Sequence, residues 1–250
     1  MYLDVTDMRD FYLTPLGQIV RRILLHRIRA RWRHVEGQTV IGLGFATPYL
    51  GAFRGEALRV GAFMPVQQGA LAWPHDAERQ AVLVEEEELP LPDSSVDKLL
   101  LIHCLEAAER VGPMLRETWR VLNPHGRLIL VAPSRAGAWA RFDTTPFGHG
   151  RPFTRGQLER ILREAGFTAT DWASALYVPP FERKLFVKWA TGFERVGAKV
   201  SSRLGGVIIV EAKKELLAPV ATRDRMRARL GSLVPAQSAG GRLRRTSKDD

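Results

Sequence analysis

Cysteine is nearly absent from the chain: Cys104 is the only one among 250 residues. A single thiol excludes an internal disulfide and a zinc site built from cysteines. Long apolar runs are also missing, because no stretch approaches the roughly 18 uninterrupted apolar residues of a membrane-spanning helix. The opening segment MYLDVTDMRD carries acids and has no apolar core of the signal-peptide type. These absences predict a cytoplasmic protein without a membrane span.

Acidic residues are scarce in two segments. Of the formal net charge of +10, residues 21–33 contribute six arginines and no acid, and residues 213–250 contribute another +6, which leaves the rest of the chain close to neutral. Such basic flanks allow a nucleic acid or an anionic surface as a partner. Neither flank has the interleaved aromatic side chains on which bases stack, so RNA binding is the weaker interpretation.

Several catalytic patterns are missing as well. The chain has no nucleophile elbow followed by aspartate and histidine, no phosphate-binding P-loop, and no pair of histidines at metal-ligand spacing. We therefore expect no metal ion at the site.

The first clear helical pattern begins at Thr14-Pro15, which supplies a capping hydroxyl and a proline for the first turn. Apolar residues then recur at helical spacing, and arginines line the opposite face. Two interpretations stay open. The helix either packs on the domain with a solvated arginine face, or it is a basic amphipathic helix for a membrane surface, an acidic substrate or RNA.

From residue 39 onward, short apolar runs alternate with helical segments. Strands are expected at 39–45, 57–63, 81–86, 96–104, 126–133, 167–178 and 205–214, and helices at 47–55, 113–122, 154–166 and between the last two strands. This alternation predicts an α/β domain with a doubly wound, mostly parallel seven-stranded sheet and helices on both faces. We expect a helical extension at 1–35, the α/β domain at 36–213, and a basic, disordered tail at 214–250.

The segment between residues 81 and 133 carries a specific pattern. Leu89-Pro90, Pro92-Asp93 and Val96-Asp97 match D-x-x-x-LP-F-x-D-x-x-FD in order and spacing. That pattern is typical of the class I S-adenosylmethionine-dependent methyltransferases of the small-molecule type, and residues 36–213 resemble this family. The resemblance implies a Rossmann-like fold, S-adenosylmethionine as the cofactor, and methyl transfer to a small-molecule acceptor.

The family's cofactor loop, D-x-G-x-G-x-G, falls on residues 42–48. Gly44 keeps its glycine, whereas Gly42 stands in place of the acid. Ala46 restricts positive φ, and Pro48 removes one backbone donor from the start of the following helix. The loop therefore has the position of a cofactor loop but altered residues.

The second strand ends at Phe63 and Met64, where the family carries an acid that holds the ribose hydroxyls. Phe63 can stack on an adenine but accepts no hydrogen bond, and a lost charge-assisted pair costs on the order of a few kcal/mol. Glu85 and Glu86 follow the third strand, where the family directs a carboxylate to the adenine amino group; the alternative is a solvated acidic loop. The predicted cofactor-binding residues are Gly42, Gly44, Ala46, Phe63, Met64, Glu85 and Glu86.

Two histidines are the catalytic candidates. His103 ends the fourth strand, over which the family's methyl donor lies, and it is either a catalytic group or a core residue. His149 belongs to the long polar loop 141–158, at the carboxyl edge where open α/β sheets bind ligands. We expect His149 to act as a base, with Asp143 and Arg151 binding the substrate; the alternative is a structured loop that caps the next helix.

Three functions follow from these observations. The first is S-adenosylmethionine-dependent methyl transfer to a small molecule. The second is a non-catalytic relative that kept the fold and acts as a binding or scaffold protein, which the missing acids at positions 42 and 63 favour. The third is RNA binding through the basic flanks. None of them determines an oligomeric state.

Overall fold

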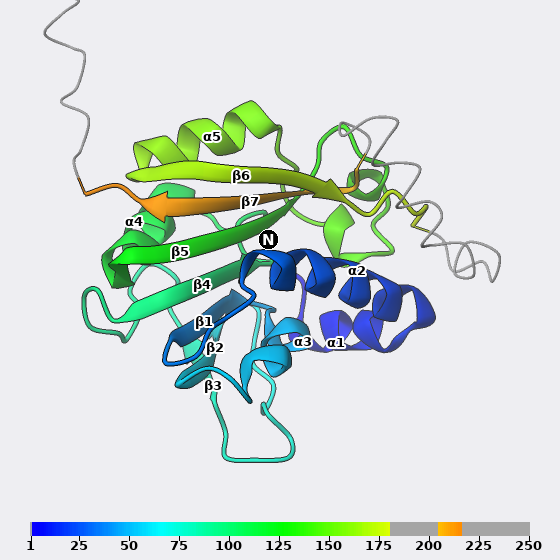
Figure 1. Cartoon of the computed structure of the whole chain (residues 1–250). Helices are drawn as coiled ribbons and strands as arrows, with labels where there is room; N and C mark the ends of the chain where they lie inside the picture. The colour runs from blue at the N-terminus through cyan, green and yellow to red at the C-terminus, as the bar shows by residue number, and fades with distance from the viewer. Residues whose placement is uncertain (1, 181–204, 217–250) are drawn as a thin grey trace, which may run out of the picture. The chain divides into compact units, whose positions relative to one another are not determined.

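A seven-stranded sheet organises the described chain (Figure 1). The computed structural model describes residues 2–180 and 205–216. The strands lie in the order β3-β2-β1-β4-β5-β7-β6; β1 to β5 are parallel, and β7 is antiparallel to both β5 and β6. Their bounds are β1 Thr39–Gly44, β2 Arg59–Pro65, β3 Ala81–Val84, β4 Val96–Ile102, β5 Leu122–Pro133, β6 Phe167–Ala175 and β7 Val207–Lys214. The predicted doubly wound, mostly parallel sheet is confirmed.

Helices cover both faces of this sheet (Figure 1). They are α1 Val5–Leu13, α2 Pro15–Arg31, α3 Thr47–Leu50, α4 Val111–Val121 and α5 Arg155–Glu164, with short 3-10 turns η1 Gly51–Phe53, η2 Trp139–Arg141 and η3 Pro146–Gly148. One apolar cluster buries side chains of α1, α2 and α3 against the sheet, and a second buries those of α4 and α5. Two clusters arise because crossovers between parallel strands return over one face or the other. No helix in the described part of the chain is long and apolar enough to cross a membrane.

The N-terminal extension contains two helices. α2 begins where the sequence predicted, with the Thr14 hydroxyl accepting from Gly17 N at 3.0 Å. α1 precedes it and is capped by Asp4, whose carboxylate accepts from Thr6 N at 2.8 Å. Both helices bury apolar side chains in the same cluster as the sheet. The extension is therefore packed on the α/β fold.

Several elements differ in length from their predicted ranges. The helix expected at 47–55 is a four-residue α3 continued by η1. β2 runs on to Pro65, because Pro65 still pairs with Val84 of β3. β5 begins at Leu122 because Leu122 pairs with Val96 across an irregularity in the β4–β5 ladder. The helix expected between the last two strands, and the tail from residue 217, lie outside the described residues. The domain boundaries at 35 and 213 stay predictions.

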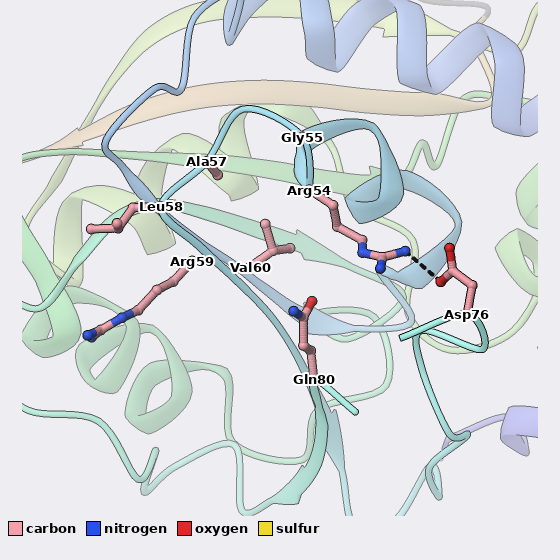
Figure 2. Close-up of a pocket in the computed structure, with 8 residues that line it drawn as sticks. All are labelled: Arg54, Gly55, Ala57, Leu58, Arg59, Val60, Asp76 and Gln80. Carbon is pink, nitrogen blue, oxygen red and sulfur yellow. Dashed lines mark hydrogen bonds and ion pairs between the residues drawn. The ribbon is translucent and has the colours of Figure 1, made fainter. Parts of the chain in front are cut away.

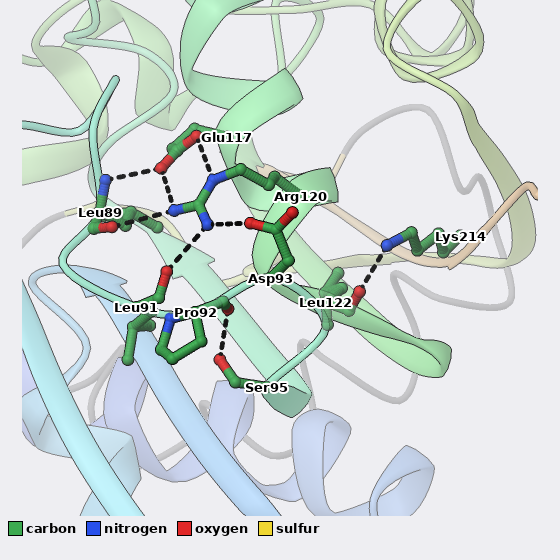
Figure 3. Close-up of polar contacts among 9 residues, drawn as sticks. All are labelled: Leu89, Leu91, Pro92, Asp93, Ser95, Glu117, Arg120, Leu122 and Lys214. Atoms are coloured by element: carbon green, nitrogen blue, oxygen red, sulfur yellow. Dashed lines mark hydrogen bonds and ion pairs between the residues drawn. The ribbon is translucent and has the colours of Figure 1, made fainter.

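The Leu-Pro pattern that resembles the methyltransferases is held by one arginine of α4 (Figure 3). Arg120 donates to Leu89 O at 3.0 Å and to Leu91 O at 2.9 Å. Its guanidinium also pairs with Asp93 and Glu117, each at 2.5 Å. Glu117 accepts from Leu89 N at 2.8 Å, and the hydrogen bond from Arg120 lowers the pKa of Glu117. The planar fork of one guanidinium thus fixes the β3–β4 loop on α4.

Asp97 of the same pattern also has a structural role. Its carboxylate accepts from Thr39 N at 2.8 Å and from the side chain of Asn123. These contacts join the start of β1 to the start of β5 through β4. The residues that carry the resemblance therefore stabilise the fold, and their contacts lie away from the carboxyl ends of the strands.

Arg120→Lys should lower the free energy of unfolding by about 1–2 kcal/mol, because an ammonium cannot hold several acceptors in one plane. Urea unfolding of wild type and variant measures the difference. Since the pKa of Glu117 is lowered in the folded state, this carboxylate stabilises the fold above its ordinary pKa of 4.5. The difference between the two proteins should therefore shrink as the pH falls below that value.

Arg116→Lys is the matched control, because Arg116 is exposed on the same helix. It should change the free energy of unfolding by less than about 0.5 kcal/mol. Equal stability of the two variants would contradict the role assigned to Arg120.

Candidate functional site at the carboxyl edge of the sheet

β1 ends in a turn that requires glycine. Gly44 has a φ of +91°, and a Cβ added there would lie 2.2 Å from Ile102 O and 2.8 Å from the Cβ of Cys104. Phe45 N donates to Ile102 O at 3.1 Å. The turn therefore packs directly on the end of β4, at the edge where open α/β sheets bind ligands.

The absence of an acid at position 42 has a steric cause. A Cβ on Gly42 would lie 2.4 Å from the Cβ of Ala46 and 2.8 Å from a methyl group of Leu50. A carboxylate would not fit there unless α3 moved. Ala46 itself has a φ of −92°, so this position does not need glycine. Gly42 and Ala46 together let α3 pack closely on β1.

The two residues predicted at the end of β2 lie in different clusters. Phe63, 8% exposed, packs with the residues beneath α4 and α5. Met64 is fully buried in the cluster of α1 to α3, and its Sδ accepts from Leu71 N at 3.4 Å. Both side chains fill the core on either side of the strand. Their contacts with a cofactor stay predictions.

An acidic pocket of about 410 Å³ lies at the carboxyl ends of β2, β3 and β4. Glu85 is exposed in it, whereas Glu86 is buried, accepts a hydrogen bond from the hydroxyl of Tyr2, and has its pKa raised by burial. Two predicted cofactor residues therefore share one pocket. Its lining residues are Tyr2, Gln67, Glu85, Glu86, Glu87, Ala107 and Glu109.

His103 is a buried, hydrogen-bonded side chain, 1% exposed, at the end of β4. Its Nε2 lies 2.8 Å from the hydroxyl of Tyr12, which lies 2.7 Å from the hydroxyl of Tyr49. Burial raises the pKa of Tyr12 well above its ordinary value, so this phenol stays protonated. Burial also raises the pKa of the neighbouring Cys104 thiol, which makes it a small core residue rather than a nucleophile. The catalytic role of His103 stays a prediction.

The chain's own N-terminus lies across this edge of the sheet. The ring of Tyr12 stacks on Phe45 of the β1 turn, with centroids 5.7 Å apart. Val5 N donates to Gln68 O at 2.9 Å, which ties the start of α1 to the segment after β2. We did not expect α1 or Tyr2 at the site from the sequence. The signal that indicates α1 is the helical spacing of its buried residues, Val5, Met8, Phe11 and Tyr12.

The loop between β5 and α5 lies against the end of β4. The ring of Phe147 is 4.5 Å from that of His103. Arg151 N donates to Glu106 O at 2.8 Å, and the guanidinium of Arg151 donates to Ala108 O at 2.5 Å. His149 is half-buried and Asp143 is exposed. The loop thus reaches the same edge as the β1 turn, while the roles of His149, Asp143 and Arg151 stay predictions.

Two arginines of the first basic flank are engaged within the chain. Arg29 pairs with Glu56 at 2.6 Å, and Arg31 pairs with Asp171 of β6. These contacts favour a helix packed on the domain over a free basic face. Most of the second flank lies outside the described residues. A nucleic acid or anionic surface as a partner stays a prediction.

A separate pocket of about 390 Å³ lies at the amino end of β2 (Figure 2). Arg54 pairs with Asp76 across it at 2.7 Å. Its lining residues are Arg54, Gly55, Ala57, Leu58, Arg59, Val60, Asp76 and Gln80. Because ligands of open α/β sheets bind at the carboxyl edge, this pocket is not the predicted cofactor site.

Solved structures share the fold of the chain. One is a Thermotoga maritima S-adenosylmethionine-dependent methyltransferase described as a possible histamine N-methyltransferase, with a TM-score of 0.59 and 15% identity over 84% of this chain and 96% of that one. Another is the Burkholderia thailandensis 1,6-didemethyltoxoflavin-N1-methyltransferase with bound 1,6-didemethyltoxoflavin and S-adenosylhomocysteine, with a TM-score of 0.53 and 17% identity over 84% of this chain and 85% of that one. At these identities the likeness concerns the fold alone.

Sequence comparison identifies similar methyltransferases. A "Probable S-adenosylmethionine-dependent methyltransferase" of Mycolicibacterium smegmatis is 35% identical over 86 residues, which are 34% of this chain and 33% of the relative. The chain thus spans about a third of the length of the curated relative that it matches. The family model described as a methyltransferase domain matches residues 41–130, which run from β1 into β5. Over these residues, the chain is similar to the S-adenosylmethionine-dependent methyltransferases and carries a methyltransferase domain.

Proposed function

We propose that the protein transfers a methyl group from S-adenosylmethionine to a small-molecule acceptor. The observation that carries this proposal is the overlap of the family match with the site. Residues 41–130 include the strands whose carboxyl ends form the glycine turn and the acidic pocket. The named relative is described as a "Probable S-adenosylmethionine-dependent methyltransferase", and the Burkholderia neighbour has 1,6-didemethyltoxoflavin and S-adenosylhomocysteine bound.

The residues at the edge fit the adenosine half of the cofactor. The acidic pocket offers the Glu85 carboxylate as an acceptor for an adenine amino group, and it opens between the segments that follow β2, β3 and β4. Gly44 lets the β1 turn pack directly on the end of β4, at the edge where the cofactor would lie. No acid is present at positions 42 and 63, so two hydrogen-bonding partners common in the family are missing.

When bound, S-adenosylmethionine supplies an electrophilic methyl group. Most of the rate in such a displacement comes from proximity and alignment, so the main task of the chain is to hold the acceptor in line. In this proposal the His149 imidazole takes the proton that a hydroxyl or amine acceptor loses. Arg151 and Asp143, on the same loop, orient the acceptor.

A second function, that of a non-catalytic binding or scaffold protein, is favoured by one observation. The hydroxyl of Tyr12 is bonded to His103, and that of Tyr2 is bonded to Glu86, so the chain's own side chains hold polar groups at the edge. In this alternative the N-terminal contacts are permanent, and no cofactor displaces them.

We expect S-adenosylmethionine to bind with a Kd of tens of micromolar or weaker, because the acids at positions 42 and 63 are missing. Glu85→Gln should weaken binding about tenfold, because the adenine amino group loses a charged acceptor. Isothermal titration calorimetry of wild type and variant measures both values.

Glu88→Gln is the matched control, because Glu88 is exposed in the same acidic run and does not line the pocket. It should bind S-adenosylmethionine as wild type does. Absence of saturable binding to wild type at millimolar ligand would overturn the enzyme proposal and leave the scaffold function.

His149→Ala should lower turnover roughly 10²- to 10⁴-fold and leave cofactor affinity nearly unchanged, as expected for the loss of a general base. A panel of hydroxyl- and amine-bearing small molecules, assayed for S-adenosylhomocysteine release, provides the measurement. His125→Ala serves as the control, since His125 is exposed near the start of β5, away from the carboxyl edge. Undiminished turnover in His149→Ala would remove this histidine from the mechanism.

A further inference from the structure

Four buried polar atoms gather after β2 and β4 without a hydrogen-bond partner among the described residues. They are Oε1 of Gln68, Nδ1 of His103, and both carboxylate oxygens of Glu106. The three residues are 1%, 1% and 4% exposed. Because buried polar groups in folded proteins are nearly always paired, such a group of unpaired atoms requires an explanation.

Glu106 contributes both of its carboxylate oxygens to this group of unpaired atoms. Nδ1 of His103 lies 3.5 Å from its Oε1, but without the alignment of a hydrogen bond. The other ring nitrogen of His103 is already bonded to Tyr12. An ionised carboxylate removed from water is costly unless a cation or several donors pair with it. The carboxylate of Glu106 therefore has the chemistry of a site for a cationic group.

The segment that leads from β4 to Glu106 packs on the β1 turn. The turn packs on Ile102 and Cys104, the residues on either side of His103. Tyr12 contacts both sides of the junction, since its ring centroid lies 5.7 Å from that of Phe45 and 5.8 Å from that of His103. Position 42 cannot supply a carboxylate to this region, because Ala46 and Leu50 fill the space. Glu106 can supply one from the end of β4.

We propose that Glu106 binds the α-ammonium group of S-adenosylmethionine, with Gln68 Oε1 as a second acceptor. His103 is a positioning residue in this proposal, because its Nδ1 lies 3.5 Å from Oε1 of Glu106. The inference rests on the proposed function. In it, the carboxylate that the family has at the end of β1 is supplied instead by a residue that follows β4. The rings of Tyr12 and Phe147 contact His103, so in this proposal the ammonium group reaches Glu106 when these side chains move aside.

Two ligands separate this role from a general effect on the pocket. S-adenosylmethionine carries the ammonium group, whereas 5′-methylthioadenosine keeps the adenosine and lacks the amino-acid part. Glu106→Gln should weaken the binding of S-adenosylmethionine by about 10- to 100-fold, because a hydrogen bond between two charged groups is lost. The affinity for 5′-methylthioadenosine should stay within about twofold of wild type, since Glu106 does not line the acidic pocket.

Stability provides an independent readout. If Glu106 acts on a ligand, Glu106→Gln should keep or raise the melting temperature of the ligand-free protein, because it replaces a buried carboxyl group that has no hydrogen-bond partner among the described residues. If Glu106 were a structural residue, the same change would lower the melting temperature. Glu159→Gln, at an exposed position of α5, is the control for loss of one negative charge and should alter neither affinity nor stability.

The outcomes distinguish this inference from the function on which it rests. If Glu106→Gln binds S-adenosylmethionine with the same affinity as wild type, the inference is overturned and the methyltransferase proposal stands. Failure of wild type to bind either ligand overturns both. Should Glu106→Gln not fold, wild type is titrated with a desamino analogue of S-adenosylhomocysteine. That analogue should bind at least about tenfold more weakly than S-adenosylhomocysteine, and equal affinity rejects the ammonium site.

Discussion

The contact between Tyr12 and His103 joins the N-terminal extension to the centre of the sheet. It combines a buried hydrogen bond with ring contacts to the β1 turn, and Tyr49 of α3 extends it into a chain of hydroxyl groups. Buried polar groups hold a structure in one arrangement because any other leaves them unpaired. As a result, the edge where a cofactor would bind is also the place where the first helix is anchored. Folding of the extension and access to the site are thereby linked.

The β1 turn shows how a cofactor loop can change without loss of the fold. Gly44 is retained because the backbone of β4 leaves no room for a side chain. Gly42 and Ala46 are both explained by the close packing of α3 on β1, and neither needs to be attributed to loss of function. Glu85 and Glu86 follow β3, and Glu106 follows β4. In our proposal, a carboxylate after β4 therefore takes the place of the acid that is missing at the end of β1.

The pattern that resembles the family makes structural contacts in the fold. Arg120 holds the Leu-Pro loop, and Asp97 joins the starts of β1 and β5. Such residues indicate the fold, because they connect elements whose spacing along the chain is typical of that fold. Site residues, in contrast, have to be judged by their contacts at the carboxyl edge.

The amino-acid sequence by itself determined the doubly wound, mostly parallel sheet and the start of α2 at Thr14, and it predicted the edge at which a ligand would bind. These features depend on local periodicity, capping and the rule for parallel crossovers, all of which can be read from neighbouring residues. Only the tertiary structure decided that Tyr2 and Tyr12 reach the candidate site and that Phe63 and Met64 face different clusters. It also decided that the buried Glu106 carboxylate has no hydrogen-bond partner among the residues that the structure describes. Those facts depend on contacts between residues far apart in the chain, and no local pattern contains them. The side chains that meet at the edge follow from how helices pack on the sheet, a property of the whole fold.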